Sequence, residues 1–188
     1  MPRLTVIIAS TRPGRIGGRV ADWFTGIARD HSGFDVSVAD LAEINLPFLD
    51  EPHHPSEGRY LHEHTRRWSA TIAEADAFVF VMPEYNFGFS APLKNAIDYL
   101  YHEWQYKPVA FVSYGMTSAG LRAVQMIKQV VTTLKMMPVT EAVSIPLRQA
   151  VDADGQLQPT AGMHSTAVAM LDELQRLTAA FATVRVPA

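Results

Sequence analysis

The sequence predicts an α/β fold, in which a parallel sheet of five strands carries helices on both faces. Short apolar segments alternate with helical patterns five times along the chain. The apolar segments are continuous runs rather than alternating ones, as expected for strands that are covered on both faces. Right-handed crossovers leave few arrangements for such strands, and the simplest has the strand order 2-1-3-4-5.

The individual elements follow from their residue types and spacing. Runs rich in Val, Ile and Phe predict strands at residues 4–9, 34–38, 77–82, 109–113 and 139–145. Apolar residues that recur at spacings of three and four predict helices at residues 17–30, 59–75, about 92–104, 121–134 and 165–182. Residues 40–58 contain three prolines and no clear period, so we expect a long loop there. Pro138 is expected to end the fourth helix.

Some side chains of the predicted helices have an expected place. Leu61, Trp68 and Ile72 are expected to point inward from the second helix. Trp104, at the end of the third helix, fits a subunit interface and the core equally well.

Length and composition narrow the possible functions. The chain has 188 residues, which is an ordinary length for one domain, and we expect a single domain over residues 1–188. It contains no cysteine, so the sequence excludes disulfides, thiolate zinc sites, thiol redox pairs and a cysteine nucleophile. Any redox chemistry therefore needs a bound cofactor to carry the electrons.

Charge and hydropathy exclude further partners. The 16 Lys and Arg residues against 19 Asp and Glu residues give a net charge of −3, without the basic stripe of a nucleic-acid-binding protein. The longest apolar runs, such as residues 77–82, are too short to span a bilayer. The chain begins almost directly with a predicted strand and shows no signal-peptide pattern. We therefore expect a cytoplasmic protein that binds neither nucleic acid nor membrane.

Ligands of such sheets bind at the carboxyl ends of the strands, where the strand order reverses. Three loops meet at this point, after the first, third and fourth strands. In the first loop, residues 10–18, hydroxyls, glycines and the guanidinium groups of Arg12 and Arg15 precede a helix N-terminus. These features favour a phosphate group. The pattern is neither GxGxxG nor GxxxxGK[ST], which argues against a Rossmann site and a nucleoside triphosphatase. An ordinary helix start with solvated arginines is the alternative.

The second and third loops fit a flat heteroaromatic ligand. Residues 83–90 combine three aromatic side chains with an amide and a carboxylate, a mixture that suits such a ligand. Residues 113–120 are small and Gly-rich, which permits close approach of the backbone, and Ser118 is a candidate cap for the following helix. Each loop alone is also compatible with an ordinary strand-to-helix turn. Together, the three loops are more specific than any one of them.

These motifs resemble the NAD(P)H-dependent FMN reductase family, which has a flavodoxin-like fold and includes flavin, quinone, azo-dye and chromate reductases. The resemblance spans residues 4–145 and includes Ser10-Thr11-Arg12-Pro13-Gly14-Arg15, Pro83-Glu84-Tyr85-Asn86 and Ser113-Tyr114-Gly115. The second motif, continued through Asp98, is the most specific. The sequence departs from many relatives at Ala9 and Ala119, where glycine is frequent.

The resemblance implies noncovalently bound FMN, with NADPH or NADH as the co-substrate. Its phosphate would be held by Ser10, Arg12, Arg15 and the amides near Ile16 and Gly17. The isoalloxazine would be lined by Pro83, Glu84, Tyr85, Asn86 and Phe87, with Tyr114, Gly115, Ser118 and Gly120 at its other edge. The family also suggests a homodimer or homotetramer. The cofactor performs the chemistry, so we assign no catalytic residue to the protein.

Two other functions are compatible with parts of the sequence. A flavodoxin-type electron carrier, or an FMN-binding module without its own NAD(P)H oxidase activity, would share the fold and the cofactor. Two loop arginines and a mild net charge favour the reductase. A metal-binding module is suggested by His53, His54, His62 and His64. A solvated or interface-lining surface explains these histidines better, because His62 and His64 are two residues apart and would point to different sides of a helix.

Overall fold

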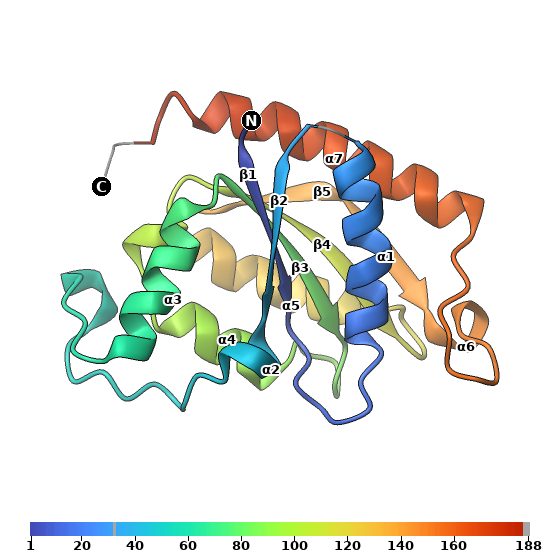
Figure 1. Cartoon of the computed structure of the whole chain (residues 1–188), viewed down its shortest axis with the longest axis horizontal. Helices are drawn as coiled ribbons and strands as arrows, with labels where there is room; N and C mark the ends of the chain where they lie inside the picture. Colours follow the sequence, from blue (N-terminus) through green and yellow to red (C-terminus); the bar gives the residue numbers. More distant parts are fainter. Residues whose placement is uncertain (32, 186–188) are drawn as a thin grey trace.

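In the computed structural model, which describes residues 1–31 and 33–185, five strands form one parallel sheet (Figure 1). They are β1 (Arg3–Ile8), β2 (Asp35–Asp40), β3 (Ala77–Pro83), β4 (Pro108–Gly115) and β5 (Met137–Pro146). Their order in the sheet is β2-β1-β3-β4-β5, which confirms the predicted order and the flavodoxin-like fold. The carboxyl ends of β1, β3 and β4 are therefore neighbours at one edge of the sheet.

Helices cover both faces of this sheet. One face carries α1 (Gly17–Asp30) and α7 (Ala161–Phe181), and the other carries α3 (Glu63–Glu74), α4 (Ala91–Asp98) and α5 (Leu121–Thr133). Two helices of one turn, α2 (Leu41–Ile44) and α6 (Leu147–Ala150), follow β2 and β5. Short 3₁₀ segments lie at Pro55–Glu57 and His102–Trp104.

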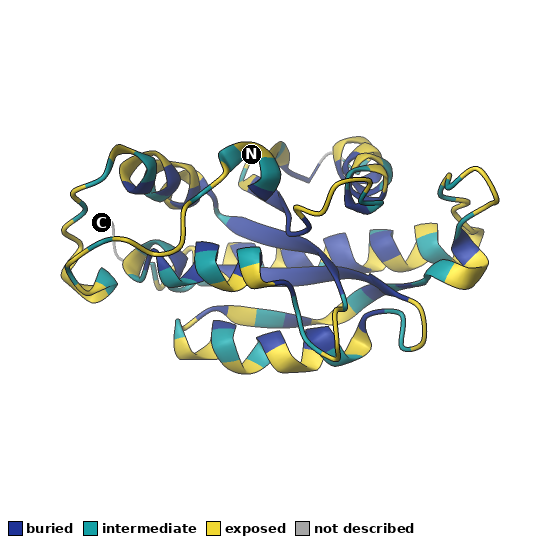
Figure 2. Ribbon diagram, turned by 90° about the horizontal axis from the view of Figure 1, so that it is seen from below, coloured by how far each residue is buried: buried dark blue, intermediate teal, exposed yellow. Residues whose placement is uncertain are grey.

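The core consists of two layers that share the sheet. Alternate strand residues point to opposite faces. Val79 and Val81 pack toward α1 and α7, whereas Phe78 and Phe80 pack toward α3, α4 and α5. Both central strands, β3 and β4, are buried along their whole length. Figure 2 shows these strands in dark blue between helices whose outer faces are exposed.

The structure corrects several predicted boundaries. The loop predicted at residues 40–58 contains α2 and a 3₁₀ turn. The helix predicted to reach residue 104 ends at Asp98. The final helix begins at Ala161, because Thr160 caps it by accepting a hydrogen bond from the amide of Met163. Pro138 lies inside β5, which tolerates proline because it is an edge strand.

The structure shows how far two side chains of the second and third predicted helices are buried. Leu61 is 56% exposed, since α3 begins after it at Glu63, so its predicted inward position is wrong. Trp104 is fully buried and packs on Phe78 with ring centroids 5.0 Å apart. Its indole donates a hydrogen bond to the carbonyl oxygen of Ile97 at 3.2 Å. Trp104 therefore belongs to the core of the subunit.

Candidate functional site

The three loops singled out in the sequence lie at the same edge of the sheet (Figure 1). Hydrogen bonds join them there. The hydroxyl of Ser90, at the start of α4, donates to the carbonyl oxygen of Ala9 at 2.8 Å. The amide of Glu84 donates to the carbonyl oxygen of Tyr114 at 2.9 Å. The fold thus places residues 10–18, 83–90 and 113–120 around one site.

The first loop leads into an open helix N-terminus. A turn closes between Arg12 and Arg15, with an N···O distance of 3.1 Å, and Gly14 adopts the left-handed φ of 68° that this turn requires. No side chain of the described residues caps α1, and its first turn contains no acidic residue. The first amides of α1 therefore offer hydrogen bonds and a partial positive charge to an anion.

Arg15 makes contacts within the protein that the sequence did not predict. Its guanidinium group pairs with the carboxylate of Asp40, with an Nη1–Oδ1 distance of 2.6 Å, and also donates to the carbonyl oxygen of Ser10. The pairing with Asp40 raises the pKa of Arg15. Arg15 thus ties the first loop to the end of β2, whereas Arg12 is exposed. Of these two arginines, the geometry favours the exposed Arg12 for a contact with a phosphate, and a phosphate contact by Arg15 stays a prediction.

Tyr114 brings a buried hydroxyl to the start of α1. The residue is 4% exposed, and its Oη has no hydrogen-bond partner within the described part of the chain. A Cβ at Gly17 would lie 2.7 Å from this oxygen, so glycine is required for the close approach. Burial raises the pKa of Tyr114, which keeps the phenol neutral. The nearby hydroxyl of Ser10 acts to lower the pKa of Tyr114, but it is too poorly placed to form a hydrogen bond of normal geometry with Tyr114 Oη.

The second loop is a tight turn with an exposed tip. Tyr85 and Gly88 exchange two backbone hydrogen bonds of 2.9 Å, and Asn86 and Phe87 both have positive φ, at 50° and 72°. Positive φ at both central residues defines a type I′ turn and is unusual for phenylalanine. The hydroxyl groups of Tyr85 and Ser10 lie 3.0 Å apart, which links this turn to the first loop. The ring of Phe87 is 65% exposed.

Glu84 joins the second loop to the third. Its carboxylate accepts hydrogen bonds from Ser118 Oγ, from the amide of Arg122 at 3.1 Å and from the guanidinium group of Arg122 at 3.2 Å. Burial opposes ionisation, but these donors and the charge of Arg122 outweigh it and lower the pKa of Glu84. Ser118 therefore does not cap α5 itself, because its hydroxyl donates to the carboxylate that does.

The glycines of the third loop permit close backbone packing. Gly120 has a φ of 89°, and a Cβ there would lie 2.5 Å from Cβ of Ser113. A Cβ at Gly115 would lie 3.1 Å from the amide nitrogen of Gly120. These contacts explain both glycines without a ligand. Whether they also contact one stays a prediction.

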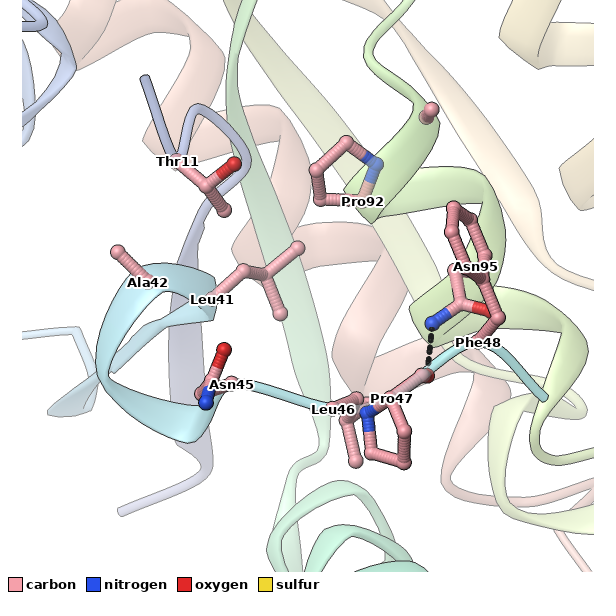
Figure 3. A pocket seen from close by; sticks show the side chains of 10 residues that line it. Thr11, Leu41, Ala42, Asn45, Leu46, Pro47, Phe48, Pro92 and Asn95 are labelled. Atoms are coloured by element: carbon pink, nitrogen blue, oxygen red, sulfur yellow. Dashed lines mark hydrogen bonds between the residues drawn. The ribbon is translucent and has the colours of Figure 1, made fainter. Parts of the chain in front are cut away.

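A cavity of about 470 Å³ opens beside the first loop (Figure 3). Thr11 forms one wall, residues 41–48 form a second and the start of α4 forms a third. The side-chain amide of Asn95 donates a hydrogen bond of 2.7 Å to the carbonyl oxygen of Pro47, which Figure 3 draws as a dashed line. This bond holds residues 45–48 against α4. Sequence reasoning missed this cavity because residues 40–58 showed no period.

The histidine-rich segment forms a packed surface cluster. The rings of His62 and His64 stack with centroids 5.2 Å apart, so the prediction that they point to different sides of a helix is wrong, because α3 begins only at Glu63. His64 Nε2 lies 2.9 Å from Asp50 Oδ1. Across residues 1–31 and 33–185, no three His, Asp or Glu side chains are arranged to hold a metal ion.

The sheet order defines a flavodoxin-like fold. The open helix N-terminus and the aromatic turn have the chemistry that a phosphorylated, flat cofactor would require. Comparison with known proteins identifies the cofactor class. Residues 2–150 match the family model of NADPH-dependent FMN reductase. The chain belongs to this family, which confirms the class suggested by the sequence motifs and favours the reductase over the electron carrier.

Individual relatives agree with this membership. The chain is 42% identical over 149 residues to an NAD(P)H-dependent FMN reductase of Schizosaccharomyces pombe, covering 77% of this chain and 74% of the relative. It is 37% identical over 141 residues to an NADPH:quinone oxidoreductase of Arabidopsis thaliana, covering 69% and 71%. A solved flavoenzyme, an NAD(P)H:(acceptor) oxidoreductase from Paracoccus denitrificans, shares the fold with a TM-score of 0.73 at 19% identity, covering 94% and 98%.

Two residues that matter at this site were absent from the sequence-based list. Asp40 lies at the end of β2, and Arg122 lies in the first turn of α5. An acidic residue that ends a strand, next to a loop with two arginines, was a usable signal for Asp40. The contact of Arg122 with Glu84 had no signal in the sequence, because it joins the loop after β3 to the start of α5, 38 residues further along the chain.

Proposed function

We propose that FMN binds noncovalently at this edge of the sheet, with its phosphate at the N-terminus of α1. The supporting observation is that two features without a hydrogen-bond partner among the described residues meet there, namely the uncapped amides of α1 and the hydroxyl of Tyr114. Exposed Arg12 adds a positive charge to the same loop. A phosphate group satisfies all three, since it accepts several charge-assisted hydrogen bonds.

The remaining residues of the site would hold and orient the flavin ring. We assign to the ring the end of β3 at Pro83 and the turn that contains Tyr85, Asn86 and Phe87. Gly115 permits close approach of the backbone from the third loop. When bound, FMN supplies the capacity to accept a hydride from NADPH or NADH and to pass electrons to a second substrate. The protein's part is to bind, orient and exclude water, so no side chain is assigned as an acid or base.

We propose a small-molecule electron acceptor for this reductase. A quinone is favoured because the Arabidopsis relative, at 37% identity, is named an NADPH:quinone oxidoreductase. Another flavin, an azo compound or a metal oxyanion would use the same exposed turn. Steady oxidation of NADPH in the presence of each acceptor, with equal acceptor concentrations, ranks them by kcat/KM.

A comparison of FMN with riboflavin tests the phosphate site, because the two differ only by the phosphate. We expect the apoprotein to bind FMN at least about a hundredfold more tightly than riboflavin, since several charge-assisted hydrogen bonds are lost together. Equal dissociation constants for the two ligands would place the phosphate outside the protein and refute the assignment.

We also propose that the protein is a cytoplasmic homodimer or homotetramer. Phe48 is 85% exposed, yet its neighbour Leu49 is fixed by a 3.0 Å hydrogen bond from its amide to Asn95 Oδ1. An exposed aromatic ring beside a backbone that is hydrogen-bonded in this way favours a subunit interface. Among the described helices, none is long and apolar enough to cross a membrane. Light scattering of Phe48→Glu tests the interface: a smaller particle than wild type supports it, and an unchanged mass contradicts it.

A further inference from the structure

The helices α1 and α5, which follow the first and third loops, differ in whether the amides of their first turn are hydrogen-bonded. The first turn of α1 is open. The first turn of α5 is closed, because the amide of Leu121 bonds to the carbonyl oxygen of Ser118 at 3.0 Å and the amide of Arg122 bonds to the carboxylate of Glu84 at 3.1 Å. A helix N-terminus attracts negative charge, and here a carboxylate from another strand already satisfies it.

Glu84 also fixes the exposed turn through Arg122. The guanidinium group of Arg122 bonds to the carboxylate of Glu84 on one side and lies 4.0 Å from the ring centroid of Phe87 on the other. This cation–π contact supports the side chain whose backbone has an unfavourable positive φ. The carboxylate itself is 10% exposed and points toward α5. Glu84 is therefore engaged by protein groups on its hydrogen-bonding atoms.

We propose that Glu84 is a positioning residue, which caps α5, orients Phe87 through Arg122, and lowers the reduction potential of the bound flavin by cancelling the positive end of α5. This inference rests on the proposed function. Reduction adds negative charge to the flavin, so a positive helix end nearby favours reduction and a carboxylate on that end opposes it. The sequence motif predicts that Glu84 lines the ring directly, which stays a prediction, and the contacts of its carboxylate support the indirect role in addition.

The test compares Glu84→Gln with Glu84→Ala. Glutamine has the same shape and can still accept hydrogen bonds from the amides of α5, but it carries no charge. We expect Glu84→Gln to retain FMN with a dissociation constant within about tenfold of wild type and to have a more positive midpoint potential. Glu84→Ala loses the cap as well, so its apoprotein melts at a lower temperature than Glu84→Gln.

Two further variants control for charge and position. Arg122→Gln removes the opposite charge and is expected to shift the potential in the negative direction, and the double variant Glu84→Gln/Arg122→Gln should return toward the wild-type value. Asp76→Asn is the matched control, because Asp76 pairs with Arg185 at 2.6 Å, close to the amino end of β1, where its carboxylate also accepts from the amide of Arg3. Its midpoint potential should equal that of the wild type.

The outcomes separate the inference from the proposed function. An unchanged midpoint potential in Glu84→Gln overturns the inference. So does an FMN affinity more than about a hundredfold weaker with an unchanged melting temperature, because Glu84 would then be a direct ligand. If the wild-type protein itself binds no FMN, the proposed function fails, and the melting temperatures of the two apoprotein variants still test the cap.

Discussion

Replacing Tyr114 with phenylalanine separates the stability of the apoprotein from its affinity for FMN. The change removes one buried oxygen atom that has no hydrogen-bond partner in the described structure. A buried polar group without a partner costs about 1–3 kcal/mol. We expect the free energy of unfolding of the apoprotein to rise by about 1 kcal/mol, near the low end, because some packing is lost as well. This corresponds to a Tm increase of about 2–4 °C for a chain of this size.

The same change is expected to weaken FMN binding. If the phenol donates to the phosphate, its loss removes a hydrogen bond to a charged group, which contributes about 1.5–3 kcal/mol. The dissociation constant of FMN should then rise by about 10- to 150-fold. Differential scanning calorimetry of the apoprotein and a fluorescence titration with FMN measure the two effects separately.

Tyr99→Phe is the matched control, because Tyr99 is equally buried but its hydroxyl is satisfied. Tyr99 Oη lies 3.0 Å from Asp50 Oδ1 and 3.1 Å from the carbonyl oxygen of Pro47. This variant should lose about 1–2 kcal/mol of stability. If Tyr114→Phe destabilises the apoprotein as Tyr99→Phe does, or if it leaves the FMN dissociation constant unchanged, the reasoning about the orphan hydroxyl is wrong.

Three further predictions test single contacts. Gly17→Ala should destabilise the protein and weaken FMN binding, since its Cβ would lie 2.7 Å from the buried hydroxyl of Tyr114. Gly18→Ala is the control, because its Cβ would meet nothing within 4 Å. A urea titration should show that Gly18→Ala raises the free energy of unfolding by about 0.5–1 kcal/mol. Arg12→Ala should raise the FMN dissociation constant about 10- to 100-fold and reduce the salt dependence of that constant. Arg29→Ala removes the same charge at the other end of α1 and should change neither the dissociation constant nor its salt dependence. Burial lowers the pKa of Lys107 to about 8, so between about pH 8 and 10.5 the unfolded chain binds more protons and stability rises with pH. Lys107→Met should remove roughly 2–3 kcal/mol of this increase in the free energy of unfolding between about pH 8 and 10.5. Identical pH profiles of stability in the wild type and the variant would contradict the lowered pKa of Lys107.

The sheet and its order followed from the sequence because two signals agreed. Continuous apolar runs such as residues 77–82 occur where both faces of a strand are covered, and the helical patterns between them leave few crossovers. Residues 40–58 gave no such signal. The first turn after β2 depends on Asp40, whose carboxylate accepts a hydrogen bond from the amide of Ala42 at 2.9 Å while it also pairs with Arg15. One residue performs both tasks, so no periodic pattern marks it.

The sequence predicted where the three loops meet but not which protein groups their side chains contact. Residue types placed the three loops at one edge, whereas the directions of Arg15 and Glu84 depend on partners in β2 and at the start of α5. The orientation of Tyr114 has a signal in the sequence. Tyr114 has the same parity along β4 as Ala110 and Val112, which pack toward α1, so its hydroxyl lies at the start of α1. Its predicted contact with the other edge of the isoalloxazine stays a prediction.

The central claim is that this chain is an NAD(P)H-dependent reductase that uses FMN at the edge formed by β1, β3 and β4. The most direct measurement is the absorbance of the FMN-loaded protein under anaerobic conditions, before and after one equivalent of NADPH or NADH, followed by a quinone. We predict that the yellow absorbance bleaches with a nicotinamide nucleotide and returns with the quinone. A protein that cannot be loaded with FMN, or whose yellow absorbance persists with both nucleotides, would contradict the account.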